Sequence, residues 1–295
     1  MSKLMNRLLI FFIGVPICIA LCFFDICKFL PLKIVCLIFC CVGSFEFSNI
    51  LNKKIKVQNP YFVMILSLLM LIIVILQDFL SFSSEIISLS IFLLIFTSIL
   101  VEIFSPKSGD SNFSESIEKI ASTLLTLVYT GYFFSFVVKM TCTNWFDDYI
   151  FYNPMMNSVY ITLFLIIVFG TDSFAWFFGM TMGKNNRGFI KASPNKSIAG
   201  FVGGIISTII VVLLITRFVP LFEQYFNHIS TFSIIFITFV TSIFAIIGDL
   251  FESVLKRCSG VKDSGTIIPG RGGVLDSIDS VILAAPVFYL LVKIF

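Results

Sequence analysis

Nine apolar segments, each about 20 residues long, follow one another along this chain and are separated by short polar stretches. A transmembrane helix needs about 20 apolar residues to cross a hydrocarbon layer of about 30 Å. The pattern therefore predicts an all-α, polytopic integral membrane protein with about nine transmembrane helices. The expected spans lie near 8–24, 32–51, 61–77, 87–104, 119–139, 158–182, 197–219, 231–251 and 274–295.

The small share of charged residues excludes an ordinary soluble protein. Of the 295 residues, 58% are hydrophobic and 13% are charged, whereas about a quarter of the residues in an average soluble domain are charged. The net charge of +3 is small, and the Lys and Arg residues are spread over many loops, which argues against nucleic-acid binding. Any chemistry must therefore be done by the helices and their connecting loops.

The distribution of basic residues predicts the orientation in the membrane. With the N-terminus in the cytoplasm, about three quarters of the 20 Lys and Arg residues fall in cytoplasmic segments, as the positive-inside rule requires. Two of these segments, 183–196 and 255–273, combine basic residues with Gly, Ser and Asp, and we expect function there. We describe the chain as one membrane domain, with N-terminal helices in 1–157 and a C-terminal catalytic part in 158–295.

Ionisable residues concentrate in 248–280, where the eighth expected span ends and the ninth begins. If the eighth helix extends beyond its apolar part, its polar residues share one face, because they are three or four positions apart. Carboxylates approaching from two helices suit a hard cation such as Mg²⁺, and the neighbouring bases suit phosphates. The alternative is that each charge only caps a helix or reaches the membrane interface. These polar residues include Asp249, Glu252, Ser253, Lys256, Asp276, Asp279 and Ser280.

Three glycines, Gly270, Gly272 and Gly273, stand just before the ninth expected span. Glycines at such a place leave backbone N–H groups open before a helix N-terminus, an arrangement that attracts anions. We therefore expect an anion-binding turn here, although any tight turn back into a membrane also uses glycine.

A second polar segment covers residues 171–200. Asp172 lies well inside an apolar span, where a charge is costly unless it is paired or faces water. The alternative to a functional role is a structural ion pair with a Lys of another helix. Ser193 and Lys196 belong to a Ser-Pro-Asn-Lys-Ser sequence that is typical of a capped helix start, but Lys196 could equally bind a phosphate.

These motifs resemble those of the phosphatidate cytidylyltransferases, also called CDP-diacylglycerol synthases. The resemblance covers roughly residues 170 to 281. The first 160 residues or so match only in being apolar and multi-span, with Glu46 between two Phe residues as a weaker match. The matched positions are Asp172, Phe174, Ala175, Gly183, Lys184, Ser193, Pro194, Lys196, Gly248 to Ser253, Lys256, Arg257, Lys262, Asp263, Pro269, Gly270, Gly272, Gly273, Asp276 and Asp279.

The resemblance implies a role for each matched polar residue. Asp249 and Asp276 are expected to bind Mg²⁺, and a second cation is possible. The expected catalytic residues are Asp249, Asp276, Lys256, Lys262 and Asp263. The expected substrate-binding residues are Asp172, Lys184, Ser193, Lys196, Ser253, Arg257, Arg271 and Asp279.

Two positions depart from the family pattern, since Arg271 stands where the family has His and Ser277 where it has Arg. Both positions lie around one turn, so the long side chain of Arg271 can serve the same phosphate as the missing Arg. An Arg cannot replace a His that carries a proton. If the family His does so, activity or substrate choice would differ here.

The implied reaction transfers the cytidylyl group of CTP to phosphatidate and gives CDP-diacylglycerol and pyrophosphate for phospholipid synthesis. Expected partners are CTP, phosphatidate and membrane lipid, with no nucleic acid and a possible homodimer. The expected location is a bacterial inner membrane, with the site facing the cytoplasm. The alternatives are a CTP-dependent transferase acting on another lipid phosphate or alcohol, a non-enzymatic membrane transporter, and a degenerate relative retained for assembly.

Overall fold

The computed structural model describes residues 14–83, 85–105, 110–143, 153–268 and 272–295. Within these residues the regular structure is helical, apart from two isolated β-bridges. The elements are α2 (Val15–Cys22), α3 (Leu30–Leu51), α4 (Pro60–Leu80), α5 (Glu85–Phe104), the 3₁₀ helix η2 (Asp110–Glu115), α6 (Ser116–Thr126), the π-helix η3 (Leu127–Phe133), α7 (Phe134–Lys139), α8 (Pro154–Thr181), α9 (Ile198–Phe218), α10 (Pro220–Phe226), α11 (Thr231–Cys258) and α12 (Leu275–Ile294).

Eight helical segments of the described chain are long and apolar enough to cross a membrane. They coincide with the second to ninth expected spans and confirm a polytopic all-α membrane protein. The first expected span, 8–24, begins outside the described residues, and its described part contains α2. The expected boundary between residues 157 and 158 falls inside α8, near its beginning.

Polar side chains cap the first turns of four long helices. Asn59 and Asn153 precede the prolines that open α4 and α8, and each side chain accepts a hydrogen bond from a backbone N–H of the first turn. Ser197 and Ser230 do the same for α9 and α11. These side chains satisfy donors that a helix N-terminus otherwise leaves unpaired, so the helix starts follow directly from local sequence.

The fifth expected span, 119–139, differs from a uniform α-helix, because its middle is the π-helix η3. Such wide turns occur frequently at functional sites. Tyr129 of η3 stacks on Phe47 at a centroid distance of 5.1 Å and lies 5.1 Å from the ring of Phe251. Its hydroxyl lies 3.5 Å from the carbonyl oxygen of Asp279. The π-helix thus brings an N-terminal aromatic side chain to α11 and α12.

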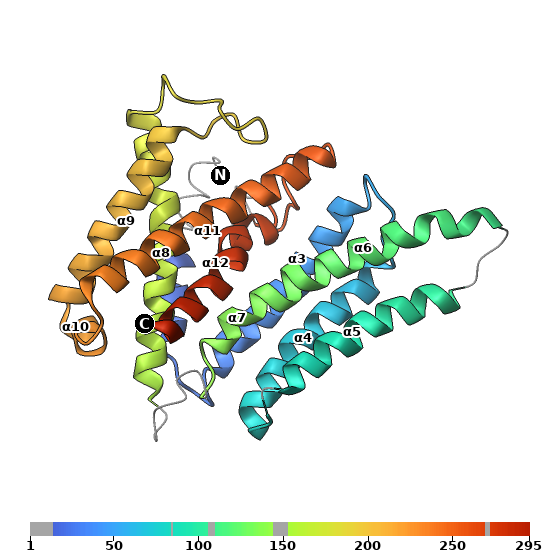
Figure 1. Ribbon diagram of the computed structural model, residues 1–295, viewed down its shortest axis with the longest axis horizontal. Coiled ribbons are helices and arrows are strands. Elements are labelled where there is room, and N and C mark those ends of the chain that lie inside the picture. Colours follow the sequence, from blue (N-terminus) through green and yellow to red (C-terminus); the bar gives the residue numbers. More distant parts are fainter. Residues whose placement is uncertain (1–13, 84, 106–109, 144–152, 269–271) are drawn as a thin grey trace.

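Helix α12 lies at the centre of the molecule (Figure 1). It packs against α11 on one side and against α3, η3 and α7 on the other. Its buried side includes Ala284, Ala285 and Phe288, each 0% exposed. Helices α8 and α9 pack along each other and contact α11. The start of α12 therefore lies where the N-terminal helices meet the C-terminal ones.

Polar contacts join the ends of neighbouring helices and their loops at two ends of the bundle. At one end Lys33 pairs with Asp78 at 2.6 Å, and Asp78 accepts a 2.7 Å hydrogen bond from the Thr143 N–H. At the other end the Lys56 N–H donates to Glu118 at 3.0 Å. The start of α3, the end of α4 and the segment after α7 thus lie at one end, and the segment after α3 and the start of α6 lie at the other, as successive membrane crossings require. Which end faces the cytoplasm stays a prediction.

Candidate active site

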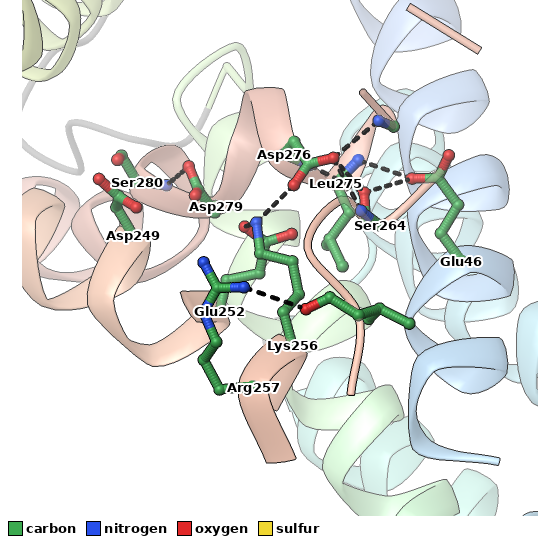
Figure 2. A network of polar contacts seen from close by, with 12 residues as sticks. Glu46, Asp249, Glu252, Lys256, Arg257, Ser264, Leu275, Asp276, Asp279 and Ser280 are labelled. Atoms are coloured by element: carbon green, nitrogen blue, oxygen red, sulfur yellow. Dashed lines mark hydrogen bonds and ion pairs between the residues drawn. The ribbon is translucent and has the colours of Figure 1, made fainter. Parts of the chain in front are cut away.

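The last turns of α11 carry the ion pairs at the centre of the candidate site. Helix α11 extends to Cys258, which confirms that its polar residues lie on one continuous helix beyond the apolar part. The ammonium group of Lys256 lies 2.7 Å from Glu252 and 2.5 Å from Asp276 of α12 (Figure 2). Lys256 therefore joins α11 to α12 through Asp276, while Glu252 holds it from one turn earlier on α11.

The Asp276 carboxylate organises the turn that precedes α12. Its Oδ2 atom accepts hydrogen bonds from Gly273 N–H at 2.7 Å and from the backbone N–H of Ser264 at 2.9 Å. The Gly272 N–H donates to the carbonyl of Ile268 at 3.0 Å. The expectation of open N–H groups is therefore wrong for Gly272 and Gly273, because acceptors of the chain itself occupy them. Gly270 lies outside the described residues.

Glu46 of α3 is a member of this site that the sequence motifs did not assign. It is 5% exposed, and its Oε2 atom accepts hydrogen bonds from the Leu275 N–H at 2.9 Å and from the Ser264 hydroxyl at 3.2 Å (Figure 2). An acid inside an apolar span is a signal for function. Its partners lie more than 200 residues away in sequence, so the sequence around Glu46 could not predict which residues it contacts.

The second polar segment reaches the same site through Lys196. Its ammonium group pairs with the carboxylate of Asp249 on α11. Nearby, the Arg257 side chain donates to the carbonyl of Ala192 at 3.3 Å. The two segments that the sequence analysis singled out therefore meet in space, and the capped helix start at Ser197 is confirmed.

A cavity of about 500 Å³ lies between α8, α9 and α11. It is lined by four of the expected site residues, Asp172, Ser193, Lys196 and Asp249, and by apolar side chains that include Trp176. Trp176 is exposed on the outer side of α8. The cavity therefore combines charged groups with an apolar wall, a combination that suits a ligand with a polar head and an apolar or aromatic part.

Four carboxyl groups converge where α8, α11 and α12 approach one another. Asp279 is 6% exposed and interacts electrostatically with Asp249, Glu252 and Asp172. Figure 2 shows Asp249, Asp279 and Glu252 in this region. The Oε1 atom of Glu252 is buried and accepts no hydrogen bond from the residues that the structure describes. Within the described residues, however, no three His, Cys, Asp or Glu side chains form a ready metal site.

Several expected site residues lie apart from these contacts. Lys184 and Lys262 are exposed, and Ser253 is half-buried on α11. Asp263 is also exposed but belongs to the turn at Asp276, because a Cβ atom on Gly272 would meet both side chains. Arg271 lies outside the described residues. The roles of all the expected site residues stay predictions, and the structure brings Asp172, Ser193, Lys196, Asp249, Lys256, Asp276 and Asp279 into one region.

Comparison with known proteins gives one family match and several similar proteins. A model described as "Cytidylyltransferase family" matches residues 5–295. The phosphatidate cytidylyltransferase of Staphylococcus epidermidis is 43% identical over 132 residues, which are 45% of this chain and 48% of that protein. The proteins of the same name from Bacillus subtilis and Staphylococcus aureus are 33% identical over 181 residues and 36% identical over 172 residues, covering 61% and 58% of each chain.

The chain thus spans about half to three fifths of the length of these curated relatives. The family match, in contrast, runs over almost the whole sequence. It includes α3, which supplies Glu46, as well as the C-terminal helices that carry the ion pairs. This chain belongs to the cytidylyltransferase family.

Proposed function

We propose that this protein transfers the cytidylyl group of CTP to phosphatidate and produces CDP-diacylglycerol and pyrophosphate. The observation that carries the proposal is the Lys196–Asp249 ion pair, which unites the two motif segments beside a cavity of about 500 Å³. The relatives named phosphatidate cytidylyltransferase support the choice of substrates.

The reaction needs no nucleophile from the protein. An oxygen of the phosphatidate phosphate attacks the α-phosphorus of CTP, the bond from that phosphorus to the β-phosphate oxygen breaks, and pyrophosphate leaves. The protein must align two polyanions and offset their repulsion. An ammonium group has three donors: Lys256 directs two at carboxylates and Lys196 directs one. Both therefore retain donors for phosphate oxygens.

A divalent cation such as Mg²⁺ fits the acidic cluster. Proteins hold Mg²⁺ through one or two carboxylates, while water and substrate phosphates complete its shell. We assign it to Asp249 and Asp279, beside Oε1 of Glu252, which accepts no hydrogen bond from the described residues. Asp276, the ligand expected from the motif, is less suited, because both its oxygens already accept hydrogen bonds. Held there, such a cation would supply positive charge that offsets the charge of the nucleotide phosphates.

The location of the cavity suits a substrate that arrives from the bilayer. Trp176 and Met180 line it and are 65% and 51% exposed on α8, so a lipid has an apolar approach to Lys196. We propose that this end of the bundle faces the cytoplasm, because the basic loops around the site would then follow the positive-inside rule. CTP would enter from the aqueous side of the same site.

The test is formation of CDP-lipid from labelled CTP by purified protein, with phosphatidate and a panel of other lipid phosphates, over a range of Mg²⁺ concentrations. Asp249→Asn and Asp279→Asn are expected to raise the Mg²⁺ concentration needed for half-maximal turnover at least 10-fold. Asp276→Asn is expected to lower turnover at every Mg²⁺ concentration, because it frees Lys256.

The matched control is Glu223→Gln, which changes an exposed acid on α10 at a distance from these contacts and is expected to keep full turnover. No CDP-lipid from folded wild-type protein with any lipid phosphate would overturn the proposed function. If Asp276→Asn raises the Mg²⁺ requirement and Asp279→Asn does not, the cation is held by Asp249 and Asp276, the pair expected from the sequence.

A further inference from the structure

Glu46 connects α3 to the turn before α12. Its Oε2 atom accepts from the Leu275 N–H at 2.9 Å and from the Ser264 hydroxyl at 3.2 Å. The Leu275 N–H belongs to the first turn of α12, where donors have no partner within the helix and the helix dipole favours an anion. A carboxylate from the N-terminal half of the chain therefore caps the helix that carries Asp276 and Asp279.

The backbone of the turn closes tightly around the second oxygen of Glu46. A Cβ atom on Gly265 would lie 2.2 Å from Oε1, and one on Gly273 would lie 2.6 Å from it. Side chains larger than glycine would therefore collide with the carboxylate at both positions. Oε1 itself is buried and has no hydrogen-bond partner among the described residues. The Glu46 carboxylate is therefore held by its hydrogen bonds and also by the close fit of the two glycines around it.

Ser264 connects Glu46 to the ion pair between Asp276 and Lys256. Its hydroxyl lies 3.2 Å from Glu46 Oε2 and 2.8 Å from Asp276 Oδ2, so the two carboxylates share its single proton. The other oxygen of Asp276 pairs with Lys256. A continuous polar path therefore runs from α3 through Ser264 and Asp276 to Lys256 on α11 (Figure 2). Displacement of Glu46 would release one end of this path.

We infer that Glu46 is a positioning residue for the proposed cytidylyl transfer, on which this inference rests. It acts through Ser264 and the N-terminus of α12 to hold Asp276 and Lys256 at the site. The motif residues of the C-terminal half would then reach their working geometry only when α3 is packed against them. The N-terminal half, where the motif resemblance is weak, would thus contribute to the site by positioning the start of α12.

The test compares Glu46→Ala with Glu46→Gln in the CDP-lipid assay. Alanine removes both hydrogen-bond acceptors, and a displacement of about 1 Å at a reacting site can lower a rate about 100-fold, so kcat is expected to fall 10- to 100-fold. Glutamine keeps one oxygen for Leu275 and Ser264, and its NH₂ group replaces an oxygen that accepts no hydrogen bond from the described part of the chain. It is expected to restore kcat to within about threefold of wild type.

The matched control is Glu102→Ala. Glu102 has the same exposure, 5%, but lies on α5, where it contacts Gln58 and Ser116. Its loss is expected to lower the unfolding temperature without changing kcat of the folded protein. If Glu46→Ala does not fold, Glu46→Asp replaces it, since it keeps the charge but shortens the reach to Leu275. It is expected to lower kcat about 10-fold.

Wild-type kcat in Glu46→Ala, or in Glu46→Asp where the alanine variant does not fold, would overturn the inference. Equal losses in the glutamine and alanine variants would overturn it too, because they would show that the charge matters and not the acceptor.

Trypsin cleavage after Lys262 gives a readout that does not depend on activity. If wild-type protein makes no CDP-lipid, the proposed function fails. Faster cleavage in Glu46→Ala than in Glu102→Ala would still support positioning, and equal rates would refute it.

Discussion

Replacement of Gly248 by Ala tests how closely the two site helices must approach. Gly248 lies on α11 where α12 passes against it. A Cβ atom there would lie 2.5 Å from the carbonyl oxygen of Asp279 and 3.1 Å from the Cα atom of Ser280. Both are backbone atoms, so no side-chain rotation can relieve the collision. Ordinary contacts begin near 3.4 Å, and the helices must therefore separate by roughly 0.9 Å.

This separation sets the expected magnitudes. Overpacking of this kind costs about 1–3 kcal/mol, while Ala gains about 1 kcal/mol over Gly in a helix. The free energy of unfolding should therefore fall by only about 0–2 kcal/mol. Turnover should fall further, about 10- to 100-fold, because Asp249 and Asp279 approach each other across this contact and a 1 Å displacement can cost about 100-fold in rate.

The assay is CDP-lipid formation together with the unfolding temperature in detergent. Gly170→Ala on α8 is the control, because a Cβ atom there would lie 3.6 Å from Thr208 Oγ1, an ordinary contact. The control is expected to keep wild-type turnover. Full turnover in Gly248→Ala would refute the reasoning. Equal losses in both variants would show that helix flexibility, and not close approach, is what the glycines provide.

Two further predictions concern stability. Lys33→Met leaves Asp78 buried without its 2.6 Å ion partner, so the free energy of unfolding should fall by about 3–5 kcal/mol, and Lys33→Met/Asp78→Asn should recover part of it; an unchanged unfolding temperature in the single variant would refute this. Ser197→Ala and Ser230→Ala each remove a helix cap and should each cost about 1 kcal/mol. Only Ser197→Ala, beside Lys196 in the cavity that the lipid is proposed to reach, should raise the KM for phosphatidate; equal KM values in both variants would contradict the assignment.

The positions of the helices followed from local sequence. A run of about 20 apolar residues crosses a membrane whatever surrounds it, and Asn or Ser before a Pro or an apolar run marks a helix start. The extension of α11 to Cys258 meets the condition under which the spacing of Asp249, Glu252 and Lys256 predicts that they share one face. The π-helix in the fifth span did not follow from local sequence, because its wide turn depends on the packing of Tyr129 and Gly131 against other helices.

The sequence by itself also determined which residue types gather at the site, since two short segments hold most of the acids and bases that the structure brings together. Only the tertiary structure decided their partners. Lys196 pairs with Asp249, 53 residues away, and Glu46 accepts from Leu275, 229 residues away. The glycine N–H groups expected to bind an anion instead meet Asp276 and a backbone carbonyl. Such pairings depend on how helices cross and in what register, which no local pattern specifies.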